Sequence, residues 1–133
     1  MAFPIDIKYI IEAEEELGFE FPTSFKEKMI EENGGDVQTE NDYWNLYPFF
    51  DKSDKKRISR TCNHIILETK EAKKWNGFPV NAIAIAGNEC GDQLVFLPLD
   101  NDNRKLSEKI YFWYHETGEL EKVAENIQEL TKD

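Results

Sequence analysis

Three residues in this sequence have side chains that suit nucleophilic catalysis: Cys90, Asp92 and His115. A thiol, an imidazole base and an orienting carboxylate form a catalytic group only where the fold brings them together, and the sequence contains no spacing that requires this. Cys90 lies in a glycine-containing segment beside an apolar run, where a cysteine is more often a small packing residue. We therefore expect no catalytic residues and no enzyme activity.

The sequence also lacks the motifs that bind metals and cofactors. His115 has no second histidine at the spacing of a zinc-binding helix, and the two cysteines do not have the spacing of metal ligands. The run 100–103 resembles the start of a calcium loop, but Arg104 and Lys105 follow where that loop needs a ligand and a glycine. The sequence has no glycine-rich phosphate loop and no serine elbow. We expect neither a metal nor a cofactor.

The stretch from Ala82 to Leu99 is predicted to form the centre of the fold. Two apolar runs, 82–86 and 94–99, have the length of buried strands, and the link between them carries two glycines. A hairpin is the simplest interpretation. Its link places Glu89 and Asp92 at the ends of two core strands, where a rigid scaffold can hold functional residues. Turn formation and solubility are the alternative explanation of these acids.

Two helices are predicted near the N-terminus. The first begins after Asp6 as N-cap and ends at Gly18, and its core face is expected to contain Ile7, Ile10, Ile11 and Leu17. The second begins near Pro22 and ends at 33–35, and its apolar stripe is Phe25, Met29 and Ile30. The short link between them predicts an antiparallel or angled pair.

The rest of the chain is predicted to contain further strands, helices and loops. Strands are expected at 43–47, 110–115 and 120–124. A third helix is expected after Thr61 or Asn63, with one face formed by Ile65, Ile66, Thr69, Ala72 and Trp75. Asn126 is expected to cap a short final helix. The polar segments 36–42 and 51–60 are interpreted as loops.

The net charge of −11 on 133 residues limits the possible partners. Residues 1–42 carry −9, residues 43–80 carry +4 and residues 81–133 carry −6. Nucleic acids and anionic membranes need the opposite charge, so neither is expected to bind directly. A basic protein would be attracted, although solubility alone also explains an acidic surface. Two cysteines and the lack of a leader-like segment favour a cytoplasmic location.

Several motifs stand in an order that resembles the SUKH superfamily. They are the run 11–18 followed by Phe21–Pro22, Phe25–Lys26 and Asn33–Gly35, then Trp44–Pro48, Ile83–Ala86 with Cys90–Asp92, and Tyr111–Trp113 with His115–Gly118. The set is similar to the branch named after the yeast cell-wall assembly regulators. The resemblance implies one α+β domain over residues 1–133. Its sheet would be mixed and mainly antiparallel, with two N-terminal helices and further helices packed around it.

The resemblance also implies a role. Bacterial members are mostly thought to be immunity proteins that bind and neutralise a cognate polymorphic toxin, often a nuclease, and no catalytic residues carry over from the family. Gly91, Asp92 and Trp113 match the family pattern, where their role can be to hold the fold. A regulatory scaffold, as the yeast relatives suggest, is the alternative, and a small hydrolase is a third interpretation.

Local charge selects the candidate partner-binding residues. One acidic segment contains Glu31, Glu32, Asp36, Glu40 and Asp42. A second candidate patch contains Glu89, Asp92, Asp100 and Asp102. Acidic side chains at a rim would speed association with a basic toxin, and exposed aromatic residues would anchor it.

Overall fold

A hairpin of two buried strands lies at the centre of the sheet, as predicted. The computed structural model describes residues 3–39 and 42–132. In it, β3 (Ile83–Gly87) pairs antiparallel with β4 (Gln93–Phe96). Side chains 83–86 and 94–96 have no solvent exposure, because helices or loops cover both faces of this hairpin.

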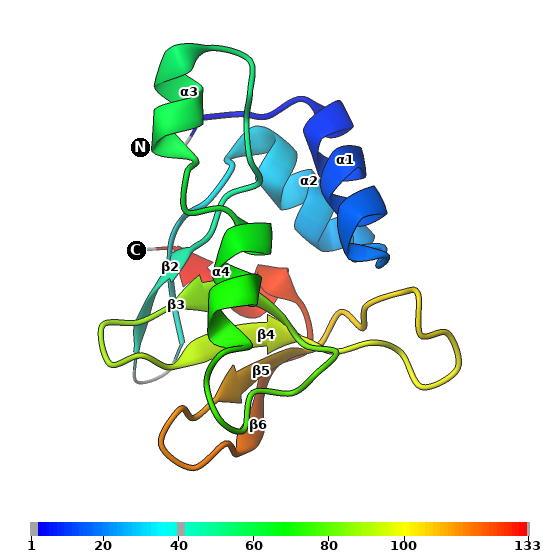
Figure 1. The fold of residues 1–133 in the computed structure, drawn as a ribbon, viewed down its shortest axis with the longest axis vertical. Helices are drawn as coiled ribbons and strands as arrows, with labels where there is room; N and C mark the ends of the chain where they lie inside the picture. The colour runs from blue at the N-terminus through cyan, green and yellow to red at the C-terminus, as the bar shows by residue number, and fades with distance from the viewer. Residues whose placement is uncertain (1–2, 40–41, 133) are drawn as a thin grey trace.

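Seven strands form one sheet in the order β6-β5-β4-β3-β2-β1-β7, and all neighbouring strands are antiparallel (Figure 1). The other five strands are β1 (Gly35–Gln38), β2 (Tyr43–Leu46), β5 (Ile110–Trp113), β6 (Leu120–Ala124) and β7 (Thr131–Lys132). With the helices on its faces, this sheet confirms the predicted α+β class. The expected strands near 43, 110 and 120 are all present.

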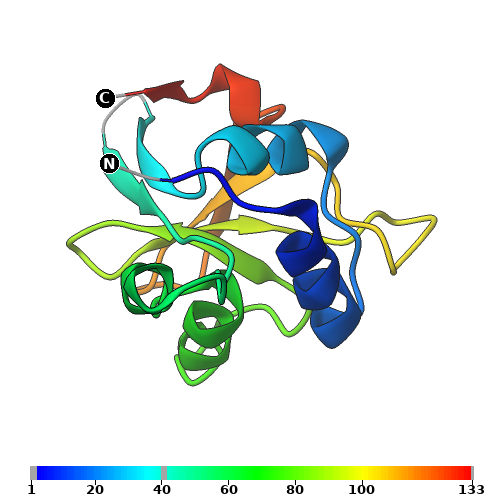
Figure 2. The same cartoon turned by 90° about the horizontal axis from the view of Figure 1, so that it is seen from above.

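Helices lie on both sides of the sheet (Figure 2). On one side, α2 (Thr23–Glu31) packs near the 3-10 helix η1 (Ile127–Glu129), and the rings of Phe25 and Phe96 meet edge to face at 5.1 Å. On the other, α4 (Ile65–Ala72) contacts β3, where Thr69 Oγ1 accepts a hydrogen bond from the Ala84 backbone N–H at 3.0 Å. The chain therefore buries both faces of β3.

The first helix, α1 (Ile7–Leu17), has the predicted ends but not the predicted core face. The Asp6 side chain accepts a hydrogen bond from the Lys8 backbone N–H, and Gly18 ends the helix at a φ of 78°. Its buried residues are Tyr9, Ile10 and Ala13, whereas Ile7 and Ile11 are more than 40 % exposed. Placing Ile7 and Ile11 in the core was wrong, because the chain covers only the arc of α1 centred on Ile10.

Two segments predicted as loops are regular structure. β1 pairs with β2 and β7, and of its residues only Val37 is buried, so the segment has too few apolar residues to predict a strand. α3 (Lys55–Arg60) begins at Asp54, whose side chain accepts a hydrogen bond from the Arg57 backbone N–H. None of the α3 residues is buried, so its sequence lacks the helical spacing of apolar residues from which a helix is predicted.

The predicted limits of α4 were also wrong. Its N-cap is His64, whose Nδ1 accepts a hydrogen bond from the Leu67 backbone N–H. The Thr61 hydroxyl is already used, since it donates to the Arg57 carbonyl and accepts from the Asp51 N–H. The helix ends at Ala72, which leaves Trp75 beyond its end and 52 % exposed. Among the helices of the described residues, none has the length and apolar character needed to cross a membrane.

Candidate functional site

Three of the predicted acidic residues meet at one open groove on the outer face of β2. Asp36 on β1, Asp42 before β2 and Glu89 in the β3–β4 turn line this groove of about 750 Å³, together with Tyr43, Asn45, Tyr47 and Gly87. We call it the acidic groove. Tyr43 is 62 % exposed at its edge. The structure thus brings Glu89 to two acids that lie 47 and 53 residues before it in the sequence.

Strand register explains why these residues converge. Asn45 pairs with Asp36 on one side and with Gly87 on the other, so β1, β2 and β3 present these positions on the same face. Gly87 lacks a side chain, and the Tyr47 hydroxyl occupies the space that a Cβ atom would need there. The floor of the acidic groove is therefore backbone and tyrosine ring.

The Tyr47 hydroxyl is a hydrogen-bond donor to Gln93 Oε1 at 2.9 Å. Burial, followed by the Glu68 carboxylate, raises the pKa of Tyr47 to about 12, against a smaller lowering by the Gln93 hydrogen bond. The phenol therefore stays protonated at physiological pH and supplies no base to the groove.

The other predicted acids lie elsewhere. Glu31 faces a separate groove beside η1, and Glu32 lines a second groove that it shares with Asp36. Asp100 and Asp102 lie in the loop after β4, at the opposite end of that strand from Glu89 (Figure 1). The expected patch of Glu89, Asp92, Asp100 and Asp102 is therefore divided, because β4 separates its two halves. Glu40 lies outside the described residues.

Asp92 holds the β3–β4 turn in place. Its Oδ1 accepts the His115 backbone N–H at 3.0 Å and lies 2.6 Å from His115 Nδ1, while its Oδ2 accepts from Asn88 Nδ2. Burial raises the pKa of the Asp92 carboxyl, but the hydrogen bonds from His115 and Asn88 outweigh it, so the pKa is lowered. Asp92 is largely buried and positions the turn that carries Glu89.

The three residues with catalytic potential are only partly assembled. Asp92 and His115 are in contact, and the rings of Trp75 and His115 meet edge to face with their centroids 5.6 Å apart. Cys90 is exposed, and its thiol forms no hydrogen bond with any residue in the described ranges. Within those ranges, no three side chains of His, Cys, Asp or Glu are grouped so that they could hold a metal ion.

The second groove was missed by sequence reasoning. It has a volume of about 530 Å³, and its lining contains Arg57 and Arg60 of α3, the ring of Phe3 and the carboxylates of Glu32 and Asp36. We call it the arginine groove. The basic run 52–60 was the available signal, but it was interpreted as a solvated loop.

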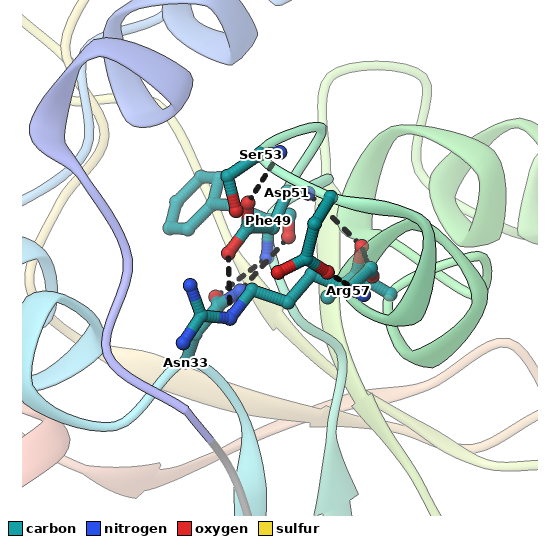
Figure 3. Close-up of polar contacts among 7 residues, drawn as sticks. Asn33, Phe49, Asp51, Ser53 and Arg57 are labelled. Atoms are coloured by element: carbon teal, nitrogen blue, oxygen red, sulfur yellow. Dashed lines mark hydrogen bonds and ion pairs between the residues drawn. The ribbon is translucent and has the colours of Figure 1, made fainter.

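A polar network fixes the chain beside the arginine groove (Figure 3). The buried Asn33 side chain donates to the Phe49 carbonyl at 2.9 Å and accepts from the Phe49 N–H at 2.8 Å. Asp51 then accepts the Ser53 N–H, and its other carboxylate oxygen lies 4.0 Å from Arg57 Nε. These contacts tie the segment after β2 to α2 and α3.

Comparison with known proteins identifies the family. Residues 4–133 match the SMI1 / KNR4 family (SUKH-1). The chain belongs to this family. The resemblance inferred from the motifs is therefore confirmed, and this SUKH-1 family is known for immunity and regulatory roles and is generally non-catalytic. Searches of curated proteins and of solved structures gave no match.

Two of the quoted SUKH motifs, Cys90–Asp92 and Tyr111–Trp113 with His115–Gly118, contribute residues that hold the fold in this SUKH-1 chain. Trp113 is fully buried, and its Nε1 donates a hydrogen bond to the Gly77 carbonyl at 3.2 Å. Gly91 has a φ of 95° and packs against the His115 ring, which is held by Asp92. These residues are part of the scaffold, whereas other residues of the quoted motifs line the grooves: Asn45 and Tyr47 line the acidic groove, and Gly34 and Pro48 line the arginine groove.

Proposed function

We propose that this SUKH-1 chain is an immunity protein that binds and neutralises a cognate toxin through the acidic groove. The observation that supports this is the convergence of Asp36, Asp42 and Glu89 around an open groove with an exposed Tyr43 at its edge. Exposed tyrosines are frequent anchors of protein interfaces, and acids around them favour a basic partner.

The expected toxin is a nuclease. A nuclease binds the phosphate backbone of its substrate with basic residues, so its active site is a basic surface. An acidic protein can cover that surface without performing any chemistry. The net charge of −11 would also attract the toxin over a distance and raise the association rate.

A pair of charge reversals tests this proposal. D36K/E89K changes the acidic groove, and D100K/D102K makes the same change in net charge at the other end of β4. We expect D36K/E89K to weaken toxin binding by at least about tenfold and to flatten its salt dependence, because local attraction becomes repulsion. Calorimetry over a range of salt concentrations measures both effects. Equal losses of toxin affinity in the two variants would show that net charge alone causes the effect. This result would contradict binding at the acidic groove.

The partner itself is best sought by co-purification. The tagged chain would be isolated from cells that also express the toxin encoded by a neighbouring gene. We expect a stoichiometric basic toxin domain that salt releases. Recovery of host signalling proteins in its place would support the regulatory scaffold and overturn the immunity function.

A further inference from the structure

Three cations gather around one aromatic ring at the arginine groove. The guanidinium carbons of Arg57 and Arg60 each lie 4.9 Å from the centre of the Phe3 ring, and the Lys56 ammonium lies 5.6 Å from it. Residues 51–60 contain five bases and two acids, in a chain whose net charge is −11. Because α3 buries none of its residues, core packing does not account for this composition.

The arginine groove and the acidic groove adjoin each other. Asp36 and Asn45, which pair across β1 and β2, line both of them. One open surface therefore crosses the outer face of these two strands. At one end it carries the cations of α3, and at the other it carries Asp42 and Glu89.

We infer that this surface is complementary to a protein partner of mixed charge, which places basic side chains in the acidic groove and carboxylates against Lys56, Arg57 and Arg60. The inference rests on the proposed toxin-binding function and extends it. The toxin would carry acidic side chains at the margin of its basic site. Guanidinium groups suit this role, because they bind carboxylates through paired hydrogen bonds.

The charges of the arginine groove favour a protein over nucleic acid or an anionic membrane. Glu32 and Asp36 line the same groove as Arg57 and Arg60. A uniform polyanion bound to these arginines would meet the two carboxylates in the same groove and the negative charge of the whole chain. A protein surface can present both signs at this scale.

A surface with two signs also fixes orientation. A partner turned end to end would bring like charges together at both grooves, and such contacts oppose binding. The contact between Arg57 and Asp51, with the Arg57 side chain 35 % exposed, keeps one guanidinium in position while leaving part of it accessible. Opposed charges would thus select one toxin and one mode of docking.

The variant K56E/R60E tests the inference with the toxin. It leaves the Arg57–Asp51 contact intact, and K73E/K74E is its matched control, with the same charge change beyond the end of α4. Attraction by net charge alone predicts that both variants bind a basic toxin at least as tightly as the wild type. The mixed-charge surface predicts that K56E/R60E binds about tenfold more weakly and that K73E/K74E shows no loss.

Short charged peptides test the surface without the toxin. In an NMR titration, hexaglutamate is expected to shift the backbone amide signals of α3, and hexalysine those of Asp36, Asp42 and Glu89. A lack of α3 shifts with hexaglutamate, or stronger α3 binding by a short DNA duplex, would overturn the inference. So would wild-type toxin affinity in K56E/R60E. In that case a loss in D36K/E89K would still leave the proposed function standing.

Discussion

Replacement of Asn33 by alanine gives a direct test of the network beside the arginine groove. Asn33 is 6 % exposed, and its side chain forms two hydrogen bonds with the backbone of Phe49, a residue that is 1 % exposed. Asn33→Ala leaves the N–H and the carbonyl of Phe49 buried without these partners. Each such group costs about 1–3 kcal/mol, so we expect the free energy of unfolding to fall by roughly 2–5 kcal/mol.

Urea unfolding measures this loss, provided that the slope of unfolding free energy against urea concentration is unchanged. The matched control is Asn81→Ala. Asn81 is exposed and makes no side-chain hydrogen bond with the part of the chain that the structure describes, so its replacement should cost less than about 0.5 kcal/mol. A loss below about 1 kcal/mol for Asn33→Ala would show that water or a shifted chain replaces both hydrogen bonds, and would refute the reasoning.

Two further predictions concern the floor and the turn of the acidic groove. Gly87→Ala should destabilise the protein by about 1–3 kcal/mol, because its Cβ would collide with the Tyr47 hydroxyl. Tyr47→Phe should restore part of this loss in the double variant, and thermal unfolding of the three variants measures it. Asp92→Asn should lower the free energy of unfolding most at neutral pH. Because the pKa of Asp92 is lowered in the folded protein, its carboxylate stabilises the fold above about pH 4, and this stabilisation is lost in acid. Urea unfolding of Asp92→Asn and of the wild type at neutral pH and at pH 3 measures this. An equal difference between their urea midpoints at the two pH values would contradict the prediction.

Much of the fold was predictable because its signals are local. The apolar runs on both sides of the 87–92 link predicted β3 and β4, and the cap residues Asp6 and Gly18 predicted both ends of α1. Asn126 likewise caps η1 by accepting the Gln128 backbone N–H. In each case, one short segment contains both the pattern and the reason for it.

Elements without a buried face escaped the same reasoning. α3 has no apolar stripe, and β1 has one buried residue, so hydrophobic periodicity carried no information about them. The opposite error placed Ile7, Ile11 and Trp75 in the core. Their side chains are apolar, but which arc of a helix is covered depends on elements that are distant in the sequence.

The candidate site was predicted residue by residue but not as an arrangement. The acids Asp36, Asp42 and Glu89 were selected on charge, yet they were assigned to two different patches. The pairing of Asn45 with Gly87 brings them together, and this is a contact between strands about 40 residues apart. Asp92 was selected on the same grounds, but its hydrogen bonds with His115 give it a structural role.

The uneven cover of the sheet explains where a binding surface can form. α4 packs on the outer face of β3, while the outward residues of β1 and β2, Asp36, Tyr43 and Asn45, remain exposed. The alternate residues of β2, Trp44 and Leu46, are buried in the core. Because successive side chains of a strand point to opposite faces, the outward positions can change without disturbing the core. Under the proposed function, the same short strand would hold the fold on one face and select the toxin on the other.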